Sequence, residues 1–363
     1  MPFDVEKLRA ALAKVQDPLF GKDIVALGYL KEALGDGDKA VIKLKLPTPA
    51  HPHKDELEKA VREAAKAAGA SEVKLDVEAE VSSKLKPGGD KLAGVKNIIA
   101  VAAGKGGVGK STVATNLALA LRQHGATVGL LDADVYGPSV PTMLGEPDVP
   151  PGQKPGEKIT PSVHWGIKVI SVGFFVERGG AVIWRGPMVH KLLQQFIEDV
   201  DWGELDYLLV DLPPGTGDAQ LSLSQLLPIT GAVMVTTPQE VSIIDVEKAL
   251  GMWKRVEVPV LGVVENMSGF VCPSCGHHEE IFLAGGGRKL AERESLPFLG
   301  SIPLQGAVSR GGDAGKPVVI ADPSSQVART FAGIAEAVAC ALSVRNTPEP
   351  GSGKRSSKLT LIR

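Results

Sequence analysis

The sequence has few cysteines, no long apolar run and no excess of charge of one sign. Three cysteines in 363 residues are too few for a framework of disulfides, and they suit a reducing compartment. No run of about 18 uninterrupted apolar residues is present, which argues against a membrane span. The 40 basic and 42 acidic side chains nearly cancel, so a strongly basic nucleic-acid binder is not indicated.

The start of the chain also lacks a recognisable targeting signal. The segment from Met1 to Lys7 has no apolar core of a signal peptide, and Asp4 and Glu6 fit a transit peptide poorly. We therefore expect a cytoplasmic protein. A hydrophobic fraction of 44% with 23% charged residues is typical of a globular chain, and the length allows one large or two ordinary domains.

Residues 1–81 predict a small α+β domain. Apolar stripes predict helices near residues 5–15 and 57–68, and short apolar or alternating runs predict strands at 24–30, 42–46 and 73–77. Residues 82–96 carry turn residues without periodicity and are interpreted as a linker. Residues 346–363 are interpreted as a flexible tail.

Residues 97–345 predict a second, α/β domain. Near-continuous apolar runs are expected to form strands at 98–102, 128–131, 167–172, 207–210, 232–235, 260–264 and 298–302. Helices are expected at 111–123, 188–200 and 324–343. Buried strands alternating with helices indicate a mainly parallel sheet covered by helices on both faces.

A glycine-rich segment between the first of these strands and its helix matches the P-loop pattern G-x-x-x-x-G-K-[ST]. It consists of Gly104, Lys105, Gly106, Gly107, Val108, Gly109, Lys110, Ser111 and Thr112. Successive backbone N–H groups in such a loop form a nest for phosphates, and the following helix directs its positive end at them. Lys110 is expected to reach the β- and γ-phosphates of ATP, and the Ser111 hydroxyl to bind Mg²⁺.

Lys105 is an additional lysine within this loop. It cannot easily reach the γ-phosphate of its own chain while Lys110 occupies that place. It can reach across a two-fold axis into a partner's site, as an arginine finger does in trans. The alternative is a solvated charge at the mouth of the loop. The first interpretation predicts a homodimer with two nucleotides between its subunits.

Aspartates follow two of the expected strands. Asp211 ends one strand and is the expected Mg²⁺ carboxylate. Asp132 and Asp134 end another, where Asp134 is expected to orient the attacking water and Asp132 to hold the loop. The segment 213–218 after Asp211 is suited to sensing the γ-phosphate. Lys105, Lys110 and Asp134 are therefore the candidate catalytic residues.

Cys272 and Cys275 form a C-x-x-C pair, which supplies two of the four ligands that a zinc ion or an iron–sulfur cubane needs. His277 and His278 are one way to complete a zinc site, and a disulfide is a second arrangement. In the third, two copies of the pair meet in a homodimer and bind a [4Fe–4S] cluster. The third agrees with the dimer that Lys105 suggests. Cys340 lies in an apolar helical segment and is interpreted as packing.

Together these motifs resemble the Mrp/ApbC family of P-loop ATPases that carry iron–sulfur clusters, which are relatives of MinD, ParA and the nitrogenase iron protein. The matching segments are 104–112, 131–139, 184–188, 206–218, 265–268 and 272–276. The resemblance implies a deviant Walker A role for Lys105, cluster ligation by Cys272 and Cys275 of both subunits, and adenine contacts near Asn266. No physical role for Arg185 follows from its motif.

The resemblance also implies the partners, which are a cluster-assembly scaffold and apo iron–sulfur proteins that receive the cluster. The charge balance and the lack of a long apolar run predict neither a nucleic-acid partner nor a membrane span. Residues 1–81 resemble a small domain of iron–sulfur assembly proteins, on the basis of Asp17-Pro18 and residues 23–28. A cysteine often follows the Thr-Pro turn in that domain. Here His51 and His53 follow it, and they are expected to be surface histidines rather than metal ligands.

Two other functions agree with the same motifs. One is a positioning ATPase of the MinD/ParA kind, although the short alternating tail is a poor amphipathic anchor. The other is an ATPase whose cysteines hold zinc and only join the subunits. The expected function is an ATP-hydrolysing [4Fe–4S] cluster carrier with slow turnover, because beyond Asp134 no general base is evident.

Overall fold

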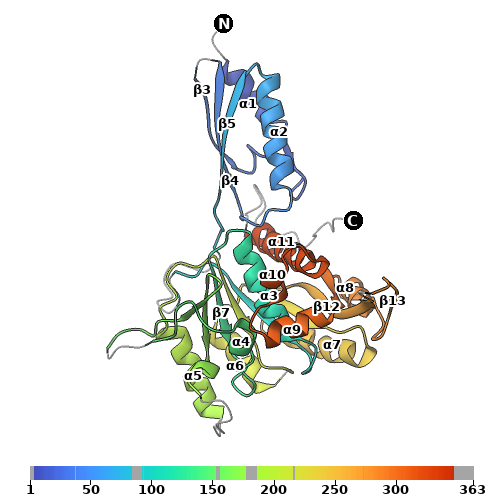
Figure 1. Ribbon diagram of the computed structural model, residues 1–363. Helices are drawn as coiled ribbons and strands as arrows, with labels where there is room; N and C mark the ends of the chain where they lie inside the picture. Colours follow the sequence, from blue (N-terminus) through green and yellow to red (C-terminus); the bar gives the residue numbers. More distant parts are fainter. Residues whose placement is uncertain are drawn as a thin grey trace. The chain divides into compact units, whose positions relative to one another are not determined.

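The chain divides into two units, each with its own apolar core (Figure 1). The computed structural model describes residues 4–36, 38–83, 92, 94–152, 156–176, 186–215, 217–272 and 274–346. Among the described residues, those from 4 to 82 group with 339–346, and those from 83 to 338 form the second unit.

The N-terminal unit packs two helices against one face of a three-stranded sheet. Its elements are α1 (Val5–Leu12), β1 (Gln16–Asp17), β2 (Lys22–Asp23), β3 (Leu30–Asp36), β4 (Lys39–Leu46), α2 (Lys54–Ala67) and β5 (Glu72–Ala79). The central strand β4 runs antiparallel to β3 and parallel to β5. Side chains of β4 alternate in burial, as expected for a sheet covered on one face. The expected order of helices and main strands is confirmed.

The prediction of a strand at residues 24–30 is wrong. Residues 24–28 form a turn, and the strand begins at Leu30. The Asp23 carboxylate accepts hydrogen bonds from the backbone N–H groups of Val25 and Ala26 at 3.0 and 2.8 Å. These N–H groups therefore stabilise a turn and do not pair with a neighbouring strand. Gly28, at φ +70°, closes the turn in the left-handed region.

His51 is buried rather than at the surface, so that expectation is also wrong. Its Nε2 lies 3.1 Å from Asp17 Oδ2, and neither side chain is exposed. The Tyr29 hydroxyl donates to the same oxygen at 2.9 Å. Because His51 Nδ1 accepts from the His53 N–H, Nε2 carries the proton and donates to Asp17. His53 is partly buried and bonds the exposed Glu56.

These bonds stabilise the charged form of Asp17 inside the unit. Burial favours the neutral acid, but the hydrogen bonds from His51, the Leu19 N–H and the Tyr29 hydroxyl outweigh it and lower the pKa of Asp17. The buried Asp17–His51 pair therefore connects β1 to the loop before α2, 34 positions further along the chain.

The C-terminal unit is built on a twisted sheet, which has nine strands within the described part of the chain. They are β6 (Ile98–Ala103), β7 (Val128–Asp132), β8 (Ser162–His164), β9 (Ile167–Ser171), β10 (Tyr207–Asp211), β11 (Gly231–Thr236), β12 (Val260–Val271), β13 (His278–Glu279) and β14 (Phe298–Leu304). The order is β13-β12-β11-β6-β10-β7-β9-β8, with β14 on β12. Only β8 and β13 are antiparallel to their neighbours among these strands.

Helices cover this sheet. They are α3 (Lys110–Gln123), α4 (Val140–Leu144), α5 (Gly186–Glu198), α6 (Asp218–Leu226), α7 (Glu240–Arg255), α8 (Gly286–Arg293), α9 (Gly306–Asp313), α10 (Val318–Ala321) and α11 (Gln326–Asn346), with a 3₁₀ turn at Val172–Phe174. Every residue of β6, β7, β10 and β11 is buried, which requires cover on both faces. The α/β fold class with a mainly parallel sheet is confirmed.

One helix of the described residues, α11, is long and apolar enough to cross a membrane. Of its most apolar window, 61% is buried inside the protein. Phe331, Ile334 and Val338 are among its buried side chains. A buried helix of this kind is typical of a packed core, so α11 gives only weak support for a span.

We predict that His51→Ala lowers the free energy of opening of the N-terminal unit by about 2 kcal/mol, because the buried Asp17 carboxylate loses a hydrogen-bond donor. Native-state hydrogen exchange of the β3 and β4 amides in the full chain measures this opening. His53→Ala, whose partner Glu56 is exposed, is the matched control and is expected to change it by less than about 1 kcal/mol. Equal effects of the two substitutions would contradict the assignment of His51.

Candidate functional site

The glycine-rich segment forms a loop between the carboxyl end of β6 and the first residue of α3. Gly107 and Gly109 have φ values of +80° and +82°, in the region that favours glycine. A Cβ placed on Gly109 would lie 2.2 Å from Asn266 Nδ2, and one on Gly104 would lie 2.3 Å from the backbone of Asp245 in α7. At these two positions α7 and Asn266 of β12 therefore leave room only for glycine.

Three elements of the sheet bring charged groups together around Lys110. The ammonium lies 2.7 Å from Asp211 Oδ1, 3.7 Å from Asp134 Oδ2 and 3.2 Å from the Ser111 hydroxyl. Strand β10 lies between β6 and β7 in the sheet, with Asp211 beside Asp132 in register. Because parallel strands place their carboxyl ends at one edge, residues 110, 134 and 211 meet there.

Asp211 has one oxygen available for a ligand. Its side chain is fully buried, and Oδ1 accepts from Lys110. Oδ2 is buried and has no hydrogen-bond partner in the described part of the chain. Burial raises the pKa of Asp211, against the opposing influence of Lys110 and Ser111. A buried carboxylate oxygen beside a serine hydroxyl is a suitable donor set for Mg²⁺.

Asp132 anchors the loop that carries Asp134. Its Oδ1 accepts from the Asp134 N–H at 3.2 Å, and its Oδ2 accepts from the Ser171 hydroxyl at 2.9 Å. Burial and the nearby charge of Asp211 raise the pKa of Asp132 to about 8. Sequence reasoning missed Ser171, which belongs to β9 and lies 39 positions away. No motif signals it, because it becomes a neighbour only when β7 and β9 pair.

Lys105 and Asn266 differ in burial and in their contacts. Lys105 is partly exposed, and no acidic side chain of the described residues lies within ion-pair distance of it. Asn266 is 7% exposed, and its Nδ2 donates to the Val108 carbonyl at 2.8 Å. Asn266 thus fixes the loop directly, and a contact of this residue with adenine stays a prediction. Thr216 and Arg185, together with the side chain of Asp218, lie outside the described residues.

The two cysteines lie at the turn between β12 and β13. The Cys272 N–H donates to the His277 carbonyl at 2.8 Å, and the Gly276 N–H donates to the Cys272 carbonyl at 2.9 Å. Cys272 is half-buried, Cys275 is exposed, and both are free thiols. The backbone N–H groups of Ser274 and Cys275 and the Cys275 side chain lower the pKa of Cys272, which favours the thiolate.

The structure does not complete a metal site around this pair. Within the described ranges, no group of three or more His, Cys, Asp and Glu side chains is placed to hold a metal ion. A zinc site completed by His277 and His278 therefore has no support, and the disulfide is not formed. The described part of one chain supplies two thiols at an exposed turn.

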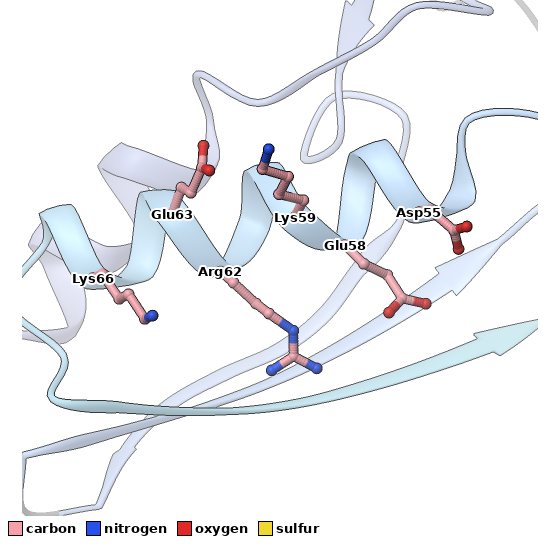
Figure 2. A pocket seen from close by; sticks show the side chains of 6 residues that line it. All are labelled: Asp55, Glu58, Lys59, Arg62, Glu63 and Lys66. Carbon is pink, nitrogen blue, oxygen red and sulfur yellow. The ribbon is translucent and has the colours of Figure 1, made fainter.

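A hollow of about 460 Å³ lies elsewhere, along the outer face of α2 in the N-terminal unit (Figure 2). Figure 2 shows that it is lined by charged side chains of this one helix: Asp55, Glu58, Lys59, Arg62, Glu63 and Lys66. Arg62 donates to the Val73 carbonyl of β5 at 3.0 Å. Alternating charges without an apolar floor are typical of a solvated helix face, so we do not assign a ligand to this hollow.

We predict that Asp132→Asn removes a pH dependence from the stability of the C-terminal unit. The folded state holds a proton on Asp132 up to about pH 8, because its pKa is raised to about 8 from the ordinary aspartate value of 3.8. Between these values the folded state binds more protons, so stability falls as the pH rises. The variant should therefore gain stability over wild type by about 1 kcal/mol per pH unit across this window.

Denaturant unfolding at pH 5, 6.5 and 8, without metal or nucleotide, measures this difference. Tryptophan fluorescence reports on the correct unit, because Trp165, Trp202 and Trp253 are among the four tryptophans and all lie in it. The exposed Asp313→Asn is the control. A variant-to-wild-type difference that stays constant with pH would refute the raised pKa of Asp132.

Two family models match the chain. Residues 94–339 match the model described as "NUBPL iron-transfer P-loop NTPase", and residues 6–81 match the model "Iron-sulfur cluster assembly protein". The P-loop, residues 104–112, and both cysteines of the pair lie within the first match. The matches follow one another along the chain with a short interval between them.

Known proteins of similar sequence carry corresponding names. The "Iron-sulfur cluster carrier protein" of Deinococcus radiodurans is 47% identical over 345 residues, covering 95% of this chain and 97% of that protein. The protein of that name from Escherichia coli is 43% identical, covering 95% of each. Mouse "Iron-sulfur cluster transfer protein NUBPL" is 46% identical, and the match covers 74% of this chain and 84% of the mouse protein.

A solved structure agrees with the fold of the C-terminal unit. The nucleotide-binding protein of Archaeoglobus fulgidus in complex with ADP is 38% identical, with a TM-score of 0.58. The match covers 67% of this chain and 94% of that one. The P-loop geometry, the two family matches and relatives of nearly equal length lead to one conclusion. This chain belongs to the family of iron–sulfur cluster carrier proteins built on a P-loop NTPase.

Proposed function

We propose that this protein binds MgATP and carries a [4Fe–4S] cluster between two copies of itself, from which it passes to apo-proteins. The observation that carries the proposal is the pair of free thiols, Cys272 and Cys275, at an exposed turn of a P-loop ATPase. A cubane cluster takes four cysteine ligands. Two copies supply four, so the cluster is the shared cargo of a homodimer.

The nucleotide is bound by the loop 104–112. Backbone N–H groups of the loop and the first turn of α3 surround the phosphates, and Lys110 contacts the β- and γ-phosphates. Ser111 and Asp211 hold Mg²⁺, in agreement with the unpaired buried oxygen of Asp211. The ion neutralises charge on the phosphate oxygens. Asn266, beside the loop, is the residue proposed to contact adenine.

Hydrolysis depends on two further residues. Asp134, directed at Lys110 from the loop after β7, orients the attacking water. Lys105 has no acidic partner among the described residues and extends into the site of the second subunit, where its charge stabilises the transition state. Turnover is slow, because Asp132 keeps its proton and no efficient general base is evident beyond Asp134.

The lowered pKa of Cys272 makes it a good iron ligand, because the thiolate binds metal. Exposure of Cys275 allows an acceptor protein to exchange ligands for the cluster. ATP binding and hydrolysis reset the dimer between loading from a scaffold and release to an apo-protein. Free exposed thiols are stable in a reducing compartment, so we place the protein in the cytoplasm.

Anaerobic reconstitution with iron and sulfide tests the proposal. Wild type is expected to gain visible absorbance and about four irons per dimer, whereas Cys272→Ala loses both because two of four ligands are missing. Cys340→Ala, at a buried cysteine, is the matched control and keeps the cluster. Full iron and sulfide uptake by Cys272→Ala would refute the carrier function.

The same anaerobic preparation distinguishes the cluster carrier from the two other functions. Stoichiometric zinc in anaerobically purified protein, with no iron uptake, would favour a zinc-joined ATPase. ATP-dependent sedimentation with liposomes or DNA, without a cluster, would favour a positioning ATPase. Either result replaces the proposal.

We predict that Lys105→Ala lowers ATP hydrolysis about 1,000-fold or more, on the scale of an arginine finger supplied in trans, while ATP binding is kept. Steady-state phosphate release and equilibrium nucleotide binding measure the two quantities. Mixing Lys105→Ala with Lys110→Ala subunits is the sharper experiment. Such heterodimers combine an intact Lys105 and an intact Lys110 in one site, so part of the activity returns. Unchanged turnover of Lys105→Ala would exclude catalysis across the interface.

A further inference from the structure

Two adjacent side chains in the middle of β12 are bonded to different parts of the site. Glu265 is fully buried and Asn266 is 7% exposed. Asn266 Nδ2 donates to the Val108 carbonyl of the P-loop at 2.8 Å. Neighbouring residues of a strand point to opposite faces, so the Glu265 side chain is directed away from that loop. It contacts the segment that carries the cysteines instead.

We call residues 268–285 the cysteine hairpin; residue 273 within it lies outside the described residues. The Glu265 carboxylate bonds both ends of this hairpin. Oε1 accepts from the Ser268 hydroxyl at 2.5 Å and from the Gly285 N–H at 2.9 Å. Oε2 accepts from the Gly287 N–H, in the first turn of α8, at 2.5 Å. Three donors and the positive end of α8 stabilise the buried charge.

The close fit around this carboxylate leaves little freedom. A Cβ placed on Gly287 would lie 3.0 Å from Glu265 Cβ, and one on Gly286 would lie 2.2 Å from the Pro238 carbonyl oxygen before α7. The Gly285–Gly287 backbone is therefore held closely against Glu265 on one side and the approach to α7 on the other. The bonds to Glu265 fix where the hairpin returns to the fold.

The backbone bends at the place where the hairpin leaves the sheet. The register between β12 and β14 shifts between Asn266 and Phe270. Met267, at φ +58°, and Gly269, at φ +70°, lie in the left-handed region. The strand is thus continuous with the sheet up to Asn266 and has an irregular joint directly after it. Cys272 is six positions after Asn266.

We infer that Glu265 is a positioning residue that transmits the state of the P-loop to the cysteine pair. Movement of the Val108 carbonyl when nucleotide binds shifts Asn266, and the adjacent Glu265 passes this shift to both ends of the cysteine hairpin. The thiols then change their exposure or reactivity with the bound nucleotide. The inference deepens the proposed function and rests on it, because it assumes that the P-loop takes MgATP and that the cysteines are the cargo ligands.

Thiol reactivity of the metal-free, reduced full chain tests the inference without any cluster. Alkylation rates at Cys272 and Cys275 are measured by peptide mass spectrometry with and without saturating MgATP. Wild type is expected to show a change of about fivefold or more, the lower range of typical coupling between sites. A wild-type rate that is independent of nucleotide would overturn the inference.

Glu265→Gln is expected to abolish this response while nucleotide affinity stays within about twofold of wild type, because the amide keeps the shape but cannot accept all three bonds. Ser268→Ala, which removes a single bond, is expected to weaken the response in part and serves if the first variant does not fold. Glu294→Gln, at the other end of α8 and bonded to Lys254, is the matched control with an intact response.

A full nucleotide response in both Glu265→Gln and Ser268→Ala would overturn the inference. So would parallel loss of nucleotide affinity and response, since that is the effect of a merely structural residue. Iron uptake by wild type, measured in parallel, distinguishes failure of this inference from failure of the proposed function. Wild type that binds the cluster without a nucleotide response refutes the inference alone, whereas a response without cluster uptake refutes the carrier function alone.

Discussion

The nucleotide site depends on the pairing of the Lys110 ammonium with a buried carboxylate. Asp211 Oδ1 lies 2.7 Å from it, and Asp132 is the register neighbour of Asp211 on the next strand. Two buried carboxylates and one ammonium cannot all be charged at low cost in a poorly solvated interior. Asp132 therefore keeps a proton and holds its loop through hydrogen bonds, while the negative charge of Asp211 is compensated by Lys110. The division of roles between the aspartates follows from this electrostatic constraint.

The order of strands explains how the thiols can be linked to the nucleotide. Lys110 and Cys272 are distant in sequence, but β12 is separated from the P-loop strand β6 only by β11. β12 thus contacts the P-loop through Asn266, midway along its length, and the same strand continues to the cysteine turn. A single strand joins the nucleotide site to the thiols, and its pairing with β14 is irregular directly after Asn266.

In the N-terminal unit, His51 contributes to stability. His51 occupies the position where the related small domain often has cysteine, and here its side chain is closed off from solvent and bonded to Asp17. Both ring nitrogens of His51 are thus occupied by protein partners, and the unit has a structural polar pair in its interior.

The sequence by itself determined the local features: the P-loop between strand and helix, the buried strands at 98–102 and 207–210, and the C-x-x-C turn, because each depends on neighbours within a few residues. It misassigned residues 24–30, since the Asp23 side chain competes locally with strand pairing. It missed the short edge strands β8 and β13, which are too brief for a periodic signal. Only tertiary structure decided the Asp132–Ser171, Glu265–Gly287 and Asp17–His51 bonds, because pairs 39, 22 and 34 positions apart meet only after the strands and loops have packed.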